Sequence, residues 1–123
     1  MTLEAKDVSF SIHDQRILEK VSIQIKEKQF VGLIGPNGSG KSTLLKNMYR
    51  LLKPESGTVL LNEQDIFKQS SKVIAKKLAV VSQETPVLFD FLVKDLVSMG
   101  RTPHKKLFEL DNKEDFNIVK EAL

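Results

Sequence analysis

The sequence predicts an α/β fold in which a small antiparallel β layer leans on a core made of a strand, a glycine-rich loop and a helix. Apolar and polar residues alternate over residues 8–12 and again over 21–25, as they do in half-buried strands. An apolar run at 30–34 leads directly into the glycine-rich loop 35–42, and apolar residues at helical spacing follow between 44 and 52. This order of elements is typical of cores that bind phosphate groups.

The strands that flank this core can be placed in chain order. Residues 13–16 form a polar bend between the first two strands. Pro54 and Gly57 interrupt the chain after the helix, and residues 58–61 are predicted to form another short strand. The compact apolar run at 78–81 is of the kind that a parallel sheet buries on both faces, so we expect a strand there too.

The last third of the sequence predicts helices. They are expected over residues 72–77 behind a cap at Ser70 or Ser71, over 93–99 closed by Gly100, and within the polar stretch 105–123. In that last stretch, Phe116, Val119 and Leu123 have helical spacing.

Residues 35–42 spell G-x-x-x-x-G-K-S, the phosphate-binding P-loop. Its glycines allow the backbone to wrap closely around a phosphate chain, and the N–H groups of the loop and of the first helical turn then point at the anion. Lys41 is expected to reach the β- and γ-phosphates, and the Ser42 hydroxyl to hold Mg²⁺. The sequence therefore predicts a protein that binds a nucleoside triphosphate with magnesium.

Composition excludes several other classes of protein. The chain has 123 residues, of which 41% are apolar and 28% charged, as in an ordinary globular domain. No apolar stretch approaches the roughly 18 residues of a membrane span, and the N-terminus does not resemble a signal peptide, so a cytoplasmic protein is expected. The absence of cysteine excludes disulfides and thiolate sites. A net charge of +3 is too small to indicate nucleic acid as a partner.

The order of antiparallel strands, the loop wording GPNGSGKST and a predicted strand that ends near Gln83 resembles the ATP-binding subunit of ABC transporters. The resemblance implies a P-loop NTPase (RecA-like) core with an antiparallel β subdomain, and ATP with Mg²⁺ as ligands. It implies that Gln83 helps to hold Mg²⁺ and the attacking water, and that Ile12 stands where the family has an aromatic residue stacked on adenine, with Phe10 as a partial substitute. The residues implied to contact the nucleotide phosphates are Gly35, Pro36, Asn37, Gly38, Ser39, Gly40, Lys41, Ser42 and Thr43.

A narrower resemblance covers the C-terminal part. Residues 97–104 contain a GR-x-PH segment, and residues 115–123 end in D-x-x-x-V-x-x-A-L, as in the ATPases for uptake of ferric siderophores, haem and cobalamin. It implies integral membrane permease subunits and a second ATP-binding subunit as partners, a substrate-binding protein indirectly, and a place on the cytoplasmic face of the membrane. The basic residues Arg101 and 104–106 are expected to be a solvated face, the alternative being a docking or phosphate-contact site.

The sequence also departs from the family pattern. Lys28 and Glu63 replace two turn glycines, so these turns are expected to take another form, with Asn62 as the left-handed residue. No signature segment, acidic Walker B strand or switch histidine occurs before Leu123, so we expect an N-terminal part of the family's cassette that is inactive alone. Residues 1–86 are predicted to form the antiparallel β subdomain and the N-terminal half of the nucleotide-binding core. Residues 87–123 are predicted to begin a helical subdomain. A soluble ABC-type switch and a non-catalytic nucleotide-binding module remain as alternatives.

Overall fold

The computed structural model describes residues 1–83, 90–106 and 109–123, and it divides into two compact units, Met1–Ser70 and Ser71–Leu123. The sequence places its domain boundary between residues 86 and 87, which lies outside the described residues, so that boundary stays a prediction. None of the helices in the described part of the chain is long and apolar enough to cross a bilayer.

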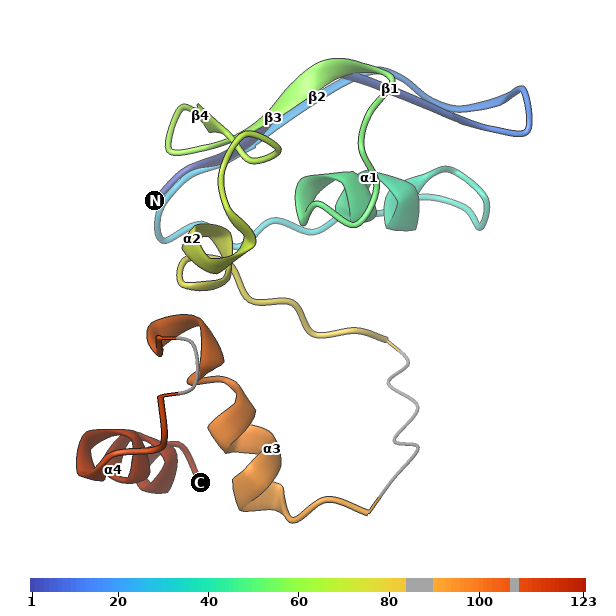
Figure 1. Cartoon of the computed structure of the whole chain (residues 1–123). Coiled ribbons are helices and arrows are strands. Elements are labelled where there is room, and N and C mark those ends of the chain that lie inside the picture. The colour runs from blue at the N-terminus through green and yellow to red at the C-terminus, as the bar shows by residue number, and fades with distance from the viewer. Residues whose placement is uncertain (84–89, 107–108) are drawn as a thin grey trace. The chain divides into compact units, whose positions relative to one another are not determined.

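The first unit is an antiparallel sheet with one helix along a face (Figure 1). Its strands lie in the order β2-β1-β3-β4, and every pair is antiparallel. The elements are β1 (Leu3–Ile12), β2 (Gln15–Ile25), α1 (Lys41–Met48), β3 (Ser56–Leu61) and β4 (Gln64–Asp65). The two predicted N-terminal strands, the strand predicted at 58–61 and the helix after the P-loop are thereby confirmed.

A bulge in β1 explains the spacing of its buried residues. Ala5 and Val8 are both buried although they are three residues apart, because the register shifts between them at Asp7, whose φ is 48°. Gly57 of β3 lies against this bulge with φ +82°, and a Cβ there would come within 2.3 Å of the Asp7 carbonyl oxygen. Only glycine fits this close approach of two backbones.

Left-handed residues make the hairpin turns of this sheet. His13 and Asp14 both have positive φ between β1 and β2, which is the pattern of a two-residue type I′ turn. Asn62 has φ 50° and Glu63 has φ 64° between β3 and β4, and Lys28 has φ 61°. Asn62 is therefore left-handed as predicted, and Lys28 and Glu63 are left-handed as well, so each of these turns accommodates a side chain at a positive φ.

Two predicted strands do not form. Residues 30–34 have no regular structure, and the side chains of Phe30 and Ile34 are 101% and 96% exposed. Residues 78–81 also lack a strand, and Val81 is 99% exposed. A strand of this apolar kind is stable only beside other strands, and within the described residues no strand pairs with either segment.

The second unit is made of short helices. They are α2 (Ser71–Ala75), α3 (Val93–Met99), the 3₁₀ helix η1 (Thr102–His104) and α4 (Lys113–Ala122). The three predicted helices are confirmed, although α4 occupies only part of the stretch 105–123. Gly100 ends α3 in a right-handed conformation and leads into η1. Asn112 and Asp115 form a reciprocal capping box that starts α4, a cap that was not predicted from the sequence.

Candidate nucleotide-binding site

The P-loop lies between the irregular segment 30–34 and the first turn of α1. Gly38 and Gly40 have φ +81° and +88°, and Gly40 is the N-cap of α1. A Cβ on Gly40 would lie 3.0 Å from both the Ile17 carbonyl oxygen and Leu18 Cδ2, so this glycine lets the loop pack directly on β2. The C-terminal end of the P-loop therefore contacts β2 at the point where α1 begins.

Lys41 is held by the loop that precedes it. Its ammonium donates to the carbonyl oxygens of Gly35 at 2.8 Å and Pro36 at 2.7 Å, and more weakly to Ser39 Oγ at 3.4 Å. An ammonium has three donors, and the first two contacts fix its position. The third direction, occupied here by a long contact with a flexible hydroxyl, is open to a stronger acceptor such as a phosphate oxygen.

The start of α1 suits an anion. The first helical N–H groups have no acceptors within the helix and carry the positive end of the helix dipole. The first turn contains no acidic residue, and Ser42 is exposed while Thr43 is half-buried. Together with Lys41, these groups concentrate positive potential at one place, and phosphate is the ligand that such a helix start commonly binds.

Packing keeps this end of the helix in place. Leu44 and Met48 are buried, and Asn47 is completely buried. The Asn47 side-chain amide donates to the Thr43 carbonyl oxygen at 2.8 Å, while its Oδ1 atom is buried without a hydrogen-bond partner. The helix is thus anchored one turn behind the residues that face the loop.

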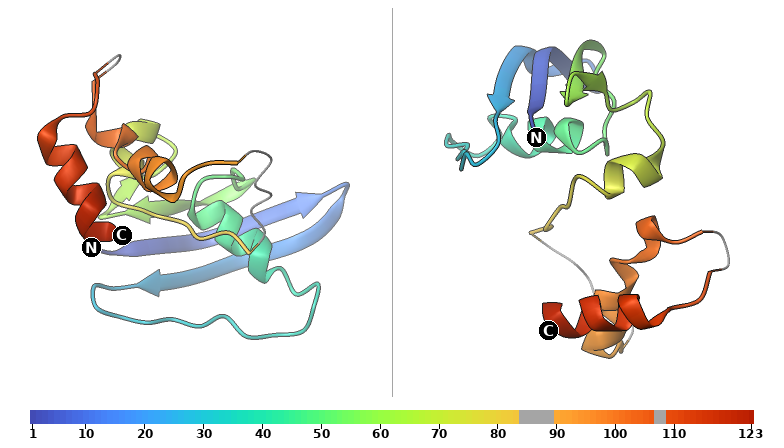
Figure 2. Two further views of the ribbon diagram at one scale, coloured as in Figure 1. Left: turned by 90° about the horizontal axis from the view of Figure 1, so that it is seen from below. Right: turned by 90° about the vertical axis from the view of Figure 1, so that its left-hand side faces the viewer.

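The turn of the β1–β2 hairpin lies at the same end of this unit as the P-loop, as Figures 1 and 2 show from two directions. Ile12 pairs with Gln15 beside this turn and is 45% exposed, whereas Phe10 is half-buried. Strand alternation places Phe10 and Ile12 on the same face. The structure therefore brings the P-loop and the hairpin end together in one unit, with exposed apolar surface available at that end.

Gln83 belongs to the other unit. It is exposed and lies at a bend just before residues 84–89, which are outside the described residues. Its expected contact with the P-loop ligands therefore stays a prediction. Among the described residues, no group of three or more His, Cys, Asp or Glu side chains could hold a metal ion.

The basic residues after Gly100 were predicted to form a solvated face, but two of them are largely buried. The Arg101 and Lys105 side chains are only 21% and 14% exposed. Arg101 Nε lies 2.8 Å from Asp115 Oδ1, and Lys105 pairs with Asp111 and lies 3.8 Å from Asp115 Oδ2. Helix packing inside this unit explains the correction, because α4 brings its acidic N-terminus to these cations.

Asp115 is the centre of that ion-pair network. Its pKa is lowered by the hydrogen bond from Arg101, by the backbone N–H of Asn112 and by the charge of Lys105, against the opposing effect of burial. The carboxylate therefore stays ionised where it is buried, and the arginine of the GR-x-PH segment has a structural partner in the aspartate that begins the D-x-x-x-V segment.

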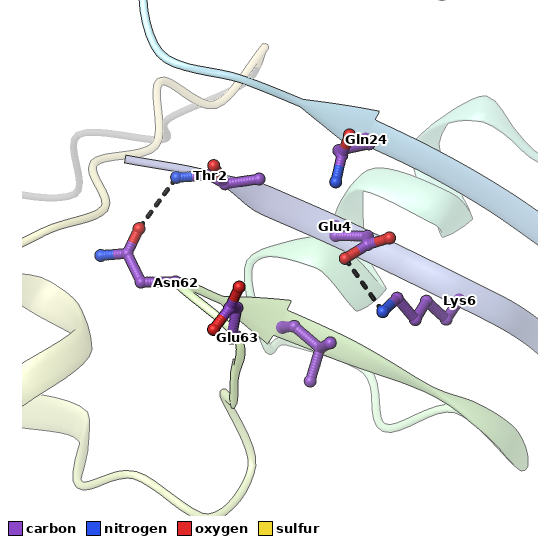
Figure 3. Close-up of a pocket in the computed structure, with 7 residues that line it drawn as sticks. Thr2, Glu4, Lys6, Gln24, Asn62 and Glu63 are labelled. Carbon is purple, nitrogen blue, oxygen red and sulfur yellow. Dashed lines mark hydrogen bonds and ion pairs between the residues drawn. The ribbon is translucent and has the colours of Figure 1, made fainter.

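The first unit also has a pocket away from the P-loop. It has a volume of about 470 Å³ and lies on the sheet surface near the N-terminus (Figure 3). It is lined by Thr2, Glu4, Lys6, Gln24, Leu60, Asn62 and Glu63. Figure 3 shows Glu4 and Lys6 paired with each other and the Thr2 N–H bonded to Asn62 Oδ1. None of the predicted nucleotide contacts lines this pocket.

Comparison with known proteins decides the family. Residues 18–122 match the family model described as ABC transporter. The chain belongs to the ABC transporter family. This ABC family chain is 40% identical over 122 residues to the iron(3+)-hydroxamate import ATP-binding protein FhuC of Bacillus subtilis, covering 99% of the chain and 45% of the relative. It is 39% identical to the cobalamin import ATP-binding protein BtuD of Halobacterium salinarum, covering 100% of the chain and 30% of the relative.

A solved structure of the ATP-binding subunit of an ABC transporter superposes with a TM-score of 0.74 at 28% identity, covering 88% of this chain and 45% of that chain. The resemblance noted from the P-loop and the GR-x-PH segment is thereby confirmed, as is the fold class. The chain spans less than half the length of these relatives.

Proposed function

We propose that this chain binds Mg²⁺–ATP at its P-loop and is part of the ATP-binding subunit of an ABC importer. The observation that carries the proposal is the Lys41 ammonium, which two loop carbonyls fix beside the N-terminus of α1. A fixed cation next to helical N–H groups matches the charge and the acceptors of a triphosphate. Membership of the ABC family supports ATP as the nucleotide.

Each residue of the site has a role in this proposal. Lys41 donates to the β- and γ-phosphates in place of its weak contact with Ser39, and Thr43 contacts the α-phosphate. Ser42 and Gln83 hold Mg²⁺, which would neutralise phosphate charge, and Gln83 also orients the attacking water. Ile12 covers the base. The backbone around the phosphates comes from Gly35, Pro36, Asn37, Gly38, Ser39 and Gly40.

The relatives extend the proposal to partners and cargo. FhuC and BtuD are named for import of iron–hydroxamate and cobalamin, and a third relative, HmuV of Bordetella pertussis, is named for import of hemin. We therefore assign the chain to uptake of iron–siderophore, haem or cobalamin. It would dock on integral membrane permease subunits at the cytoplasmic face, pair with a second ATP-binding subunit of the same kind, and depend indirectly on a substrate-binding protein.

Hydrolysis is a separate matter from binding. A water nucleophile needs a positioned base, and no predicted strand in these 123 residues ends in an Asp–Glu pair. We therefore propose that the 123-residue chain binds nucleotide without sustained turnover, and that its catalytic contribution consists of Lys41 and Gln83.

Isothermal titration with Mg²⁺–ATP tests the proposal. Lys41→Ala is expected to weaken binding by about tenfold to a hundredfold, because a charge-assisted hydrogen bond contributes roughly 1.5–3 kcal/mol. Lys46→Ala is the matched control, since Lys46 is an exposed cation on the same helix. Equal affinities for the Lys41 variant and the unmodified chain, or no binding by either, would contradict the proposal.

A further inference from the structure

Glu55 makes an unusual set of contacts with the β1–β2 hairpin. Its Oε1 accepts from the Ser11 backbone N–H at 3.0 Å, and its Oε2 accepts from Ser11 Oγ at 3.2 Å and from Arg16 Nη1 at 2.9 Å. Its own N–H donates to the Ser9 carbonyl oxygen at 2.9 Å. One residue thus bonds to both strands of the hairpin close to their turn.

The Glu55 carboxylate accepts a backbone hydrogen bond from β1 at a position that β3 does not reach. Pairing between β1 and β3 ends at Ser9 and Ser56, so β3 supplies no acceptor for the Ser11 N–H on the same edge of β1. Glu55 Oε1 provides that acceptor and extends the hydrogen bonding of the sheet by one more step. Without it, the last residues of β1 would be held from one side only.

The position of Glu55 connects this hairpin end to the P-loop. Ser11 lies between Phe10 and Ile12 and pairs with Arg16 across the hairpin. Glu55 itself stands in the segment between α1 and β3, so it joins the chain that leaves the P-loop helix to the strand end that carries Ile12. All of these residues belong to the same compact unit.

We infer that Glu55 is a positioning residue for the nucleotide base: it fixes the end of β1, and with it Ile12, relative to the P-loop. The inference rests on the proposed function, in which that end of β1 covers the base. In the proposed function the phosphates lie on the P-loop backbone, which packs on Ile17 and Leu18 of β2. Glu55 instead holds Ser11 at the end of β1. Glu55 therefore acts on the affinity for the base and leaves the affinity for the triphosphate group unchanged.

A plain surface ion pair would behave differently. The Arg16 and Glu55 side chains are 52% and 47% exposed, and exposed pairs contribute little to stability. The hydrogen bond to the Ser11 N–H is the contact that fixes the strand, and a glutamine can still accept it. Glu55→Gln should therefore preserve the function of Glu55, whereas Glu55→Ala should lose it.

The test compares titrations of the full chain with Mg²⁺–ATP and with magnesium tripolyphosphate, which lacks the nucleoside. Glu55→Ala is expected to weaken ATP binding about threefold to tenfold and to change tripolyphosphate binding by less than about twofold. Glu55→Gln should restore most of the ATP affinity. Glu4→Ala is the control, because Glu4 pairs with Lys6 on the same strand but far from the hairpin turn, and both affinities should stay unchanged.

Amide hydrogen exchange adds a measurement that does not depend on nucleotide. Glu55→Ala should accelerate exchange at Ser11 about tenfold and leave Ala5 unaffected. Equal loss of both ligands, a Glu55→Gln variant as weak as Glu55→Ala, or unchanged exchange at Ser11 would overturn the inference while the proposed function stood. Failure of the unmodified chain to bind ATP would contradict the proposed function itself and the inference with it.

Discussion

Each of the two compact units is stabilised by a different kind of internal interaction. In Met1–Ser70 the buried side chains are mostly apolar and come from paired strands and from α1; they include Ala5, Val8, Leu18, Leu44, Met48, Val59, Leu61 and Ile66. In Ser71–Leu123 the described buried apolar residues are Ile74 and Val119, and α3 buries none. There, ion pairs around Asp115 connect the start of α4 to Arg101 and Lys105 in the segment that follows α3.

This difference follows from how strands and short helices are stabilised. The strands of a hairpin are neighbours in the chain and complete each other's hydrogen bonds at once. Short helices bury little apolar area on their own, so the ion pairs around Asp115 are a larger share of the interactions in the second unit. Substitutions that distort the backbone are therefore expected to destabilise the first unit more than substitutions that remove a charge. In the second unit, substitutions that remove a charge are expected to be the more destabilising.

Gly57→Ala tests the close approach of the β3 and β1 backbones in the first unit. The new Cβ would lie within 2.4 Å of the Asp7 and Lys6 carbonyl groups at a φ of +82°, so we expect a loss of about 3 kcal/mol or more in the free energy of unfolding. Gly32→Ala is the control, because no heavy atom lies within 4 Å of that Cβ position. Chemical denaturation measures both; similar stabilities for the two variants would mean that the bulge relaxes easily.

Asp115→Asn challenges the charge network of the second unit. Because the pKa of Asp115 is lower in the folded chain than in the unfolded chain, its contribution to stability is complete above about pH 4 and disappears as the pH falls through the folded pKa. The variant should melt at a lower temperature than the unmodified chain near neutral pH, and the difference should shrink in acid.

Melting curves at a series of pH values check this expectation, with Glu114→Gln as control. Glu114 is an exposed carboxylate in the same first turn of α4. A difference that persists unchanged down to the lowest pH at which the chain stays folded would show that the Asp115 side chain acts through packing and not through its charge.

Glu63→Gly is expected to stabilise the first unit, by less than the other two substitutions destabilise the chain. Glu63 holds φ 64° in the turn between β3 and β4, and a left-handed non-glycine residue costs roughly 1 kcal/mol. The glycine variant should therefore be more stable by about that amount, while Glu63→Ala, which keeps the strained φ, should gain little. Denaturation midpoints of the two variants separate the effect of φ from the effect of charge; equal gains would assign the effect to charge.

The sequence was informative where a pattern has its partner nearby. Alternation at 8–12 and 21–25 was enough to predict two paired strands, and the P-loop motif with the apolar spacing after it was enough to predict the helix α1. The apolar runs at 30–34 and 78–81 gave an equally clear strand pattern, but a strand also requires a neighbour, which hydrophobicity alone does not reveal.

The sequence was uninformative where geometry joins distant residues. Arg101 was predicted to be a solvated surface charge, because its pairing with Asp115 depends on how the segment after α3 meets α4. Glu55 gave no signal either, since its contacts with Ser11 and Arg16 span about 40 residues of chain. The left-handed Lys28 and Glu63 were missed because propensity assigns such turns to glycine.

The most direct test of the nucleotide site is a residue-resolved amide NMR titration of the 123-residue chain with Mg²⁺–ATP. We predict that the largest chemical-shift changes fall on the amides from Gly38 to Thr43, with smaller changes at Ile12, because the loop and the first turn of α1 receive the phosphates. Changes confined to Thr2, Glu4 and Asn62, which line the pocket in Figure 3, or no saturable changes at all, would contradict a P-loop that binds nucleotide.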